Sequence, residues 1–599
     1  MLAEFTAITR ARREKLPPRY YTSRRIRFLI SPVPGGGWSI IPAGNGDGIF
    51  RPVPTVYRSG TTPPPMLIAD TAMYALGLPR DDTVDGRGTA AARHADYIAL
   101  IDSYAAASPG DAIAIQLAAF VHGPCPAELA DRVSELGGSS SDLVSFTISG
   151  AHAHETPAAQ AFWTAEVARR KGTGTEAVCC ICGQTAAALA SLPESIPGSL
   201  IPVVDSSGRS ARGQPTQLVS INTPAQGRSG VMQLANTPIC ADCGGDAVAG
   251  LTHLLGEQHS HRRNRDSVLA WWSNDTVLDD ADLAEQLDNP EPEEVHDLLN
   301  RLHAPGGDAF FVSSQARRFR AVTLAAAKSR VVIRGQIDIS LDALGDNLGA
   351  WFGDHRIDTG KDNAYVGLWR MAAATGRPAA SGPRYLPGTQ LRSIEDDLLS
   401  CALAGSRLPI SVLPHLLHRI THDGVIDTPR AALLRLCLRR PPNSSPEEAT
   451  MTGLNQDATQ TAYQCGRLLR VLENIQQNAI PEISTTLADR NRAISRNPAA
   501  LPGLVVNSRA HLKRLKGPMK KDSTAAALER QLDAVLDRIN PFPGRFTLGD
   551  QGLFVLGYHH QRAQDRRDRE AASAARRARE VGTSGDAHPQ ASPTDPGQA

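Results

Sequence analysis

The amino-acid sequence predicts a multidomain α+β protein, with a mixed α/β N-terminal region, an inserted zinc-knuckle element and an all-α C-terminal bundle. Three observations lead to this prediction. Short apolar segments alternate with basic residues near 25–30 and 330–340, two Cys-x-x-Cys motifs lie between them, and helical apolar repeats follow residue 446. The chain has 599 residues, and at about 150 residues per domain this length suggests three or four domains.

The composition is that of an ordinary globular protein, with 41% hydrophobic and 21% charged residues. The 63 basic and 62 acidic residues give a net charge of +1, which excludes a global attraction to nucleic acid and leaves only local patches. No apolar run approaches the roughly 18 residues of a membrane span. The N-terminus lacks the apolar region of a secretory signal. We expect a cytoplasmic protein without membrane contact.

The N-terminal region is expected to cover residues 1–350, and it begins with a basic segment. Eight Lys or Arg residues and one acid, Glu14, lie between Arg10 and Arg27. The apolar positions within this segment alternate: Ile26, Phe28 and Ile30. The alternation predicts a strand with arginines on its outer face. Such a face can contact phosphates, or it can simply prevent an edge strand from aggregating.

A pair of basic strands is predicted at residues 330–340, where apolar residues occupy the odd positions and Gly335 marks a break. Further candidates come from a glycine beside arginine and serine at residues 58–60, where backbone amides can approach a phosphate, and from the acid-free basic segment 509–521. The candidate nucleic-acid contacts are Arg24, Arg25, Arg27, Arg58, Ser59, Gly60, Lys328, Arg330, Arg334, Arg509, Lys513 and Arg514.

Two cysteine pairs predict a metal site at about residues 175–250. Cys179 and Cys182 form one Cys-x-x-Cys motif, and Cys240 and Cys243 form the other. A glycine follows each motif, and two thiolates at this spacing can hold one edge of a tetrahedral zinc ion. The 57 intervening residues exceed the usual ribbon spacing. We predict structural zinc, with redox-active pairs as the alternative.

Two groups of histidines are weaker candidates. His415, His418 and His422 lie at i, i+3 and i+7 of a predicted helix and so share one face. His152 and His154 are two residues apart. Three imidazoles can bind zinc, but no Glu-x-x-His motif or acidic cluster completes a catalytic site. Core or surface packing is therefore favoured for the group of three, and a surface turn for His152 and His154.

The C-terminal part is expected to contain three segments. Residues 351–445 connect the N-terminal region to a helical bundle at 446–565, and a disordered tail covers 566–599 because it lacks aromatic residues. Apolar stripes at Leu468–Ile475 and Leu528–Ile539 predict bundle helices. Thr547 and Asp550 resemble a capping box. We find no P-loop, dinucleotide fingerprint or zincin motif, which favours a non-enzymatic binding protein.

The C-terminal helices carry segments that resemble a known family. They are Ala462-Tyr-Gln-Cys-Gly-Arg-Leu-Leu-Arg-Val-Leu-Glu473 and the segment from Phe546 to Arg562. Earlier segments are similar to that family in the same order: 58–60 with 73–77, 266–273, 310–312 and 324–334. Ala325–Ala327 stands where the family has Ser-Pro-Asn. The family is the large subunit of the type I-C CRISPR Cascade interference complex, and the resemblance runs from about residue 25 to 562.

The resemblance implies a non-catalytic subunit of a crRNA-guided surveillance complex. Its partners would be the Cascade backbone subunits and crRNA, target double-stranded DNA, and a separate helicase–nuclease. In such complexes base pairing reads the target, and the protein reads a short protospacer-adjacent motif. The family commonly produces its small subunit by internal translation, for which Met451 is a candidate start.

Two other functional classes remain open at this point. One is a metal-dependent nuclease that uses the histidine groups. The other is a zinc-ribbon regulator that binds DNA by itself.

Overall fold

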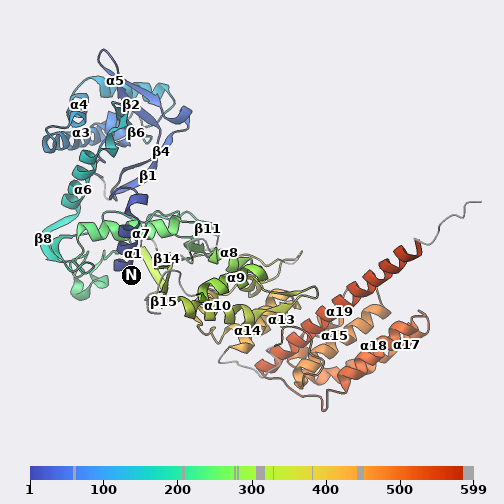
Figure 1. Cartoon of the computed structure of the whole chain (residues 1–599). Helices are drawn as coiled ribbons and strands as arrows, with labels where there is room; N and C mark the ends of the chain where they lie inside the picture. The colour runs from blue at the N-terminus through green and yellow to red at the C-terminus, as the bar shows by residue number, and fades with distance from the viewer. Residues whose placement is uncertain are drawn as a thin grey trace, which may run out of the picture. The chain divides into compact units, whose positions relative to one another are not determined.

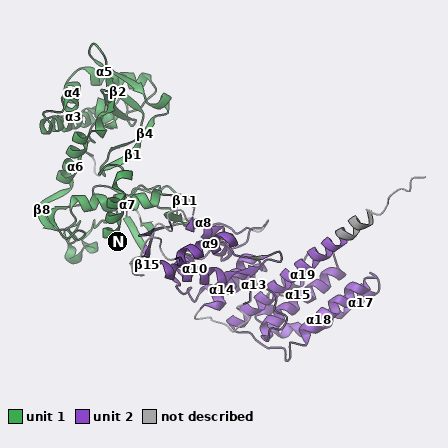
Figure 2. Cartoon of the chain, in the orientation of Figure 1, with its two compact units in different colours: residues 1–203, 211–268, 324–333 green, residues 204–210, 269–323, 334–599 purple. Residues whose placement is uncertain are grey.

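The computed structural model of the chain describes residues 1–58, 62–205, 209–275, 278, 282–304, 317–327, 330–380, 382, 384–440 and 451–584. The chain forms two compact units (Figure 1, Figure 2). Unit 1 contains residues 1–203, 211–268 and 324–333, and unit 2 contains 204–210, 269–323 and 334–599. Strands and helices mix in unit 1, and the C-terminal part of unit 2 is helical, so the predicted α+β class is confirmed.

Unit 1 begins with helix α1 (Leu2–Ala11) and then alternates short strands with helices. Its further elements are β1 (Tyr21–Ile26), β2 (Phe28–Pro32), β3 (Trp38–Pro42), β4 (Ile49–Pro54), β5 (Asp70–Thr71), α2 (Ala72–Leu76), α3 (Val84–Ala107), α4 (Ala112–Val121), α5 (Cys125–Glu135), β6 (Leu143–Ile148), β7 (Ala151–His152), α6 (Pro157–Lys171), β8 (Gly172–Val178), β9 (Thr185–Leu189), α7 (Ala241–Gly256) and β12 (His261–Arg263).

The main sheet of unit 1 has the strand order β3-β2-β6-β5, with β7 paired to β6. β2 runs parallel to β6 and antiparallel to β3. Ile26, Phe28 and Ile30 are 0%, 1% and 0% exposed, which confirms the predicted alternation. The segment is two strands rather than one, because β1 pairs with β4 and β2 joins the main sheet.

A separate four-stranded sheet has the order β12-β13-β14-β15. It contains β13 (Val268–Ser273), β14 (Arg318–Ala327) and β15 (Arg330–Ser340). Residues 330–340 are extended as predicted, but they form the single strand β15 and not a pair, because the strand continues through Gly335. Two of its apolar side chains, Val332 and Ile333, remain 42% and 43% exposed.

Unit 2 is built around one continuous hydrophobic core that extends from Leu269 to Tyr558. Its elements are α8 (Leu283–Asp288), α9 (Pro292–His303), α10 (Leu341–His355), β16 (Ile357–Asp358), β17 (Asn363–Ala364), α11 (Leu368–Ala374), α12 (Ile394–Ala404), α13 (Val412–Asp423), α14 (Thr428–Arg439), α15 (Thr461–Ala479), α16 (Leu487–Arg490), α17 (Leu501–Lys516), α18 (Asp522–Leu536) and α19 (Leu548–Ser584). Residues 351–445, which the sequence analysis treats as a connecting region, contribute helices to this core.

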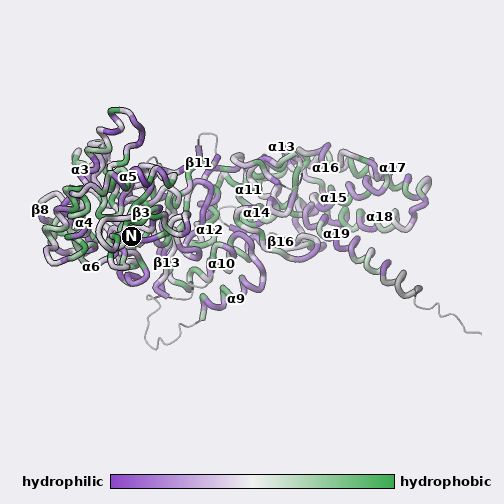
Figure 3. Tube along the Cα trace, turned by 90° about the horizontal axis from the view of Figure 1, so that it is seen from above, coloured by the Kyte–Doolittle hydropathy of each residue, from purple (hydrophilic) through white to green (hydrophobic). Residues whose placement is uncertain are grey.

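Helix α19 differs from the expectation at its C-terminal end. The predicted capping box is present. Thr547 Oγ1 accepts a hydrogen bond from the Asp550 amide at 3.2 Å, and the Asp550 carboxylate accepts one from the Thr547 amide at 3.0 Å. The helix then continues to Ser584, past residue 566 where a disordered tail was expected. Alanine and arginine are strong helix formers, and they sustain the helix without aromatic residues. Figure 3 shows hydrophilic stretches along this part of α19. None of the described helices is long and apolar enough to span a membrane.

Candidate metal centre and basic surfaces

The four cysteines of the two Cys-x-x-Cys motifs converge in unit 1. The thiols of Cys179, Cys182, Cys240 and Cys243 all lie within 4.8 Å of one another, and they are the only such group among the described residues. The first pair lies in the turn that joins β8 to β9, where Gly183 has a positive φ of 72° and its amide donates to the Cys179 carbonyl at 2.9 Å. The second pair begins helix α7. The sequence prediction of a four-cysteine cluster is confirmed.

Backbone N–H groups stabilise the thiolate form of Cys179, which is the form that binds a cation. Burial alone would raise the pKa of Cys179, but the surrounding backbone N–H groups lower it to about 6. Two of these donors are the amides of Ile181 and Cys240, at 3.5 Å and 3.4 Å from the Cys179 sulfur. Burial and the neighbouring thiols raise the pKa of Cys243. A bound cation would reverse that rise by stabilising thiolates, so the four cysteines can hold a metal ion.

A charged layer surrounds the second cysteine pair. Arg10 of α1 donates to the Cys243 sulfur at 3.5 Å and to Asp246 at 3.4 Å. Asp246 is 1% exposed and also accepts from Arg19 at 3.1 Å. Helix α1 lies close enough to α7 that a Cβ at Gly250 would come within 2.1 Å of the Phe5 carbonyl. The cluster therefore joins the β8–β9 hairpin, α7 and α1.

The predicted phosphate contacts on β1 lie in different surroundings. β1 pairs with β4 so that Arg24 faces Arg51 and Arg25 faces Phe50. Arg25 is exposed, and the opposing Phe50 ring is 71% exposed. Arg27 is half-buried and lies 5.9 Å from the centre of the Phe28 ring. The exposed pair of cation and aromatic ring is the type of surface that can contact a nucleic acid.

Arg24 is half-buried and lines a cavity of about 720 Å³. Its guanidinium makes no hydrogen bond or ion pair with any other described residue. Burial lowers the pKa of Arg24, the charge of Asp70 partly opposes this effect, and the nearby Arg58 adds to it. An anionic ligand in the cavity would relieve both penalties.

Arg58 lines the same cavity, but its guanidinium also contacts other side chains of unit 1. It pairs with Asp70, which is fully buried, and stacks 4.4 Å from the centre of the Tyr74 ring. The pair with Asp70 fixes the Arg58 guanidinium in place, and the phosphate contact at Arg58 stays a prediction. Ser59, Gly60 and Lys328 lie outside the described residues.

The remaining predicted contacts are divided between the units. Arg330 belongs to unit 1 and is half-buried on β15. Arg334 belongs to unit 2 and pairs with Asp396 at 3.1 Å. Arg509, Lys513 and Arg514 are exposed on α17 of unit 2.

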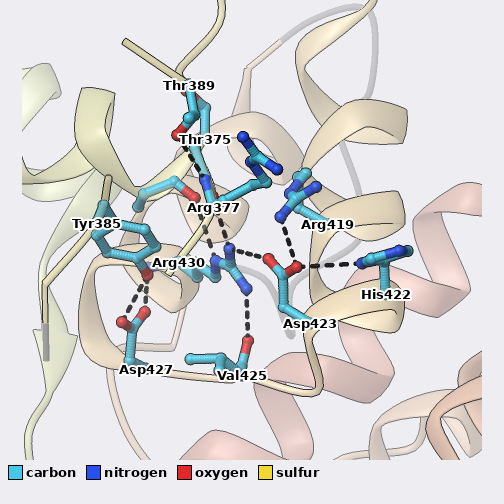
Figure 4. A network of polar contacts seen from close by, with 12 residues as sticks. Thr375, Arg377, Tyr385, Thr389, Arg419, His422, Asp423, Val425, Asp427 and Arg430 are labelled. Carbon is cyan, nitrogen blue, oxygen red and sulfur yellow. Dashed lines mark hydrogen bonds and ion pairs between the residues drawn. The ribbon is translucent and has the colours of Figure 1, made fainter. Parts of the chain in front are cut away.

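His422 of α13 takes part in a network of polar contacts (Figure 4). His422 contacts Asp423 at 3.4 Å, and Asp423 also accepts from the buried Arg430 at 2.6 Å. His415 contacts the Thr375 carbonyl at 2.8 Å. Arg430 further donates to the carbonyls of residues 374 and 376, at the end of α11 and just after it, and to that of residue 425, which lies between α13 and α14.

His152 and His154 differ in their exposure to solvent. His152 is half-buried, whereas His154 is fully buried and contacts the Ser145 hydroxyl at 2.7 Å. The favoured surface turn is thus wrong for His154. Burial lowers the pKa of His154 to about 3, so its imidazole is neutral at physiological pH.

Sequence reasoning missed two groups of residues. Asp246 and Arg10 support the cysteine cluster, but neither belongs to a motif. A row of arginines on α19, at 562, 566, 569 and 577, lines a cavity of about 510 Å³. Their spacing of i, i+4, i+7 and i+15 places them on one helix face and was available as a signal.

One comparison with known protein families gives a match that covers nearly the whole chain. A family model described as CRISPR-associated protein (Cas_Csd1) matches residues 2–565. No curated protein matches the chain.

Proposed function

Because the chain belongs to the Csd1 family of CRISPR-associated proteins, we propose that it is the non-catalytic large subunit of a type I-C surveillance complex guided by crRNA. The family match over residues 2–565 is the observation that carries this proposal. The protein would work in the cytoplasm with the Cascade backbone subunits and crRNA. There it would recognise the protospacer-adjacent motif in target duplex DNA, stabilise the R-loop and help to recruit the helicase–nuclease.

We assign duplex recognition to the β1–β4 surface of unit 1. Arg25 and Phe50 offer an exposed cation and ring, and Arg24 offers an unpaired guanidinium at the adjacent position of β1. Phosphate contacts position a protein on DNA, and a few contacts in the grooves specify the sequence. This division suits a subunit that reads only a short motif while the guide reads the target.

We also assign zinc to the cysteine cluster. Four thiolates form a closed tetrahedral site of the structural type, which leaves no open position for substrate. Zinc would therefore hold the β8–β9 hairpin against α7 and take no part in chemistry. A catalytic role for the α13 histidines receives no support from their contacts, because His415 and His422 are engaged with structural oxygen atoms.

The duplex-binding assignment predicts the effect of replacing Arg24 and Arg25 with alanine. Target binding by the reconstituted complex should weaken, and each lost phosphate contact should lower the salt slope by about 0.9. A residue that reads a base should instead reduce discrimination at one base pair by about 1–3 kcal/mol. Electrophoretic titration over a salt series on matched and mutated motifs distinguishes these results.

Arg132→Ala on α5 is the control, since its exposed pair with Glu135 contributes little. Unchanged binding in the double variant would refute the assignment.

A DNA cleavage assay and a co-purification experiment separate the other classes of function. A nuclease would cleave DNA as purified protein with a divalent metal ion. A stand-alone regulator would bind DNA without crRNA and would not co-purify with backbone subunits. Co-purification with crRNA and those subunits is the result that we expect.

We further propose that the C-terminal helices also occur as a separate small subunit that starts at Met451. Such a fragment keeps α15, α17, α18 and α19, which pack on one another. A fragment from 451 to 584 should be helical and unfold cooperatively in circular dichroism. Mass spectrometry of the natively expressed complex should find a product that begins near residue 451. An insoluble fragment together with no such product would show that the bundle exists only within the full chain.

A further inference from the structure

Helix α19 presents a line of arginines along one face. Arg562, Arg566, Arg569 and Arg577, with Ser573 between the last two, line a cavity of about 510 Å³ together with Thr359 and Thr428. We call this cavity the α19 groove. At 100° per residue the five α19 positions fall within about 80° of the helix circumference, and they span about 22 Å along the axis. The groove is therefore long, narrow and lined by cations on one side.

The opposite wall is shaped by the turn between β16 and β17. Gly360 has a φ of 87°, and a Cβ there would lie 2.8 Å from the Ala563 carbonyl, so this glycine lets the turn approach α19. His559 donates to the Asp358 carbonyl at 2.9 Å. Burial lowers the pKa of His559 to about 4, so its imidazole is neutral at physiological pH. The positive charge of the groove therefore comes from the arginines alone.

Most of these arginines are bound only to neutral oxygen atoms. Arg562 donates to the Ile426 carbonyl at 2.9 Å, Arg569 to the Asp565 carbonyl at 3.0 Å, and Arg577 to the Ser573 hydroxyl at 3.2 Å. Arg566 alone among the four forms an ion pair, with Glu570 at 3.1 Å. Glu570 is the one acidic residue among those that line the groove. Each guanidinium has five N–H donors, so most donors in the groove remain available to a ligand.

We propose that the α19 groove binds the phosphodiester backbone of single-stranded nucleic acid. The planar fork of arginine matches phosphate oxygens, and the length of the row suits several phosphates, since a stacked strand carries one phosphate for about every 3.4 Å along its axis. The cavity volume is in the range of small-ligand sites, roughly 300–1,000 Å³, and so admits one strand rather than a duplex. No Phe, Tyr or Trp side chain lines the groove, and the one ring there, His559, is buried, so we expect contacts to the backbone rather than stacking of bases.

This inference rests on the proposed function, which supplies the nucleic acid. It also extends beyond the family match, because that match ends at residue 565 and Arg566, Arg569 and Arg577 follow it. The helical extension of α19 beyond the matched residues thereby supplies three of the four arginines of the groove.

The test uses the full chain with labelled dT20 and rU20 strands as probes. Arg569→Ala with Arg577→Ala should weaken binding, and fluorescence anisotropy over a salt series should give a slope lower by about 1.4, from about 0.7 for each lost contact. Both strands should respond, because the groove holds the backbone. If only one of the two strands binds the native chain, or if the double variant binds both as the native chain does, the proposal is wrong.

A matched control removes the same charge elsewhere in unit 2. Arg530→Ala with Arg545→Ala changes two exposed arginines outside the groove and should leave the salt slope unchanged. If the two double variants lower the salt slope of strand binding equally, the effect is one of general charge and the proposed groove is wrong. Arg24→Ala separates this result from the proposed function: it should reduce duplex recognition without changing strand binding. If Arg24→Ala reduces only duplex recognition, the result concerns the β1–β4 surface of unit 1 and leaves the α19 groove unaffected.

Discussion

Replacing Cys240 with serine should abolish metal binding and make unit 1 sensitive to protease. Native protein purified without chelator should contain about one zinc per chain, and the variant almost none. The expected effect is large, because structural zinc contributes roughly 10–16 kcal/mol of apparent binding free energy in zinc-finger domains. Most side chains of β8 are exposed, so the β8–β9 hairpin has little hydrophobic core of its own. Without metal it should separate from α7 and be cleaved between residues 172 and 256.

The neighbouring Cys180 provides a control in the same turn. It is exposed and lies outside the four-thiol cluster, so Cys180→Ser should keep both the zinc and the protease resistance. Elemental analysis and limited proteolysis measure the two effects. Native protein without zinc, or a Cys240→Ser variant that retains it, would mean that the four cysteines are only buried thiols. In that case serine should cause a mild packing loss.

The cysteine cluster could be predicted from sequence because its chemistry is local to two short motifs. The first Cys-x-x-Cys pair lies in a turn and the second at the start of α7, and each is brought together by its own short segment, so the 57 residues between the pairs did not obscure the signal. The supporting residues had no such signature. Arg10 and Asp246 are separated by more than 230 residues and meet only because α1 packs against α7. Tertiary packing of this kind cannot be inferred from spacing.

The basic segments show why charge alone predicts poorly. Arg58 and Arg24 look equivalent in the sequence, but Arg58 is paired with Asp70 whereas Arg24 is unpaired in a cavity. The difference depends on a carboxylate twelve residues away from Arg58 that is fully buried. A run of arginines therefore locates a candidate surface, and the structure decides which side chains in it are free.

The polar face of α15 is the clearest failure of helical periodicity. The stripe Leu468–Ile475 is buried as predicted, but the opposite face is buried too, because α17, α18 and α19 all pack on this helix. A Cβ at Gly466 would lie 1.9 Å from the Phe554 carbonyl, and one at Gly557 would lie 2.1 Å from the Tyr463 carbonyl. The two segments that carry the family resemblance thus meet at a close helix crossing. Their glycines permit this approach, and their polar residues satisfy one another inside it.

Arg470 is the centre of that buried polar group. It donates to Glu473 at 2.7 Å and to Asp565 at 2.9 Å, and all three side chains are no more than 6% exposed. Asn474 accepts a further hydrogen bond from Arg470 at 2.7 Å, and Tyr558 donates to Glu473 at 2.6 Å. Removing the cation would leave two carboxylates in a site from which water is excluded. Breaking a buried ion pair on one side typically costs about 3–5 kcal/mol.

We therefore expect Arg470→Met to lower the free energy of unfolding of unit 2 by about 3–5 kcal/mol, measured by urea denaturation of the full chain. Arg566→Met on α19 is the matched control. Its pair with Glu570 is about half exposed on both sides, so its loss should cost less than about 1 kcal/mol. Adding Glu473→Gln and Asp565→Asn to Arg470→Met should restore part of the stability, because it removes both uncompensated charges. If Arg470→Met is as mild as the control, the network contributes no more than an exposed pair, and the apolar packing of α15 against α19 alone holds the two motifs together.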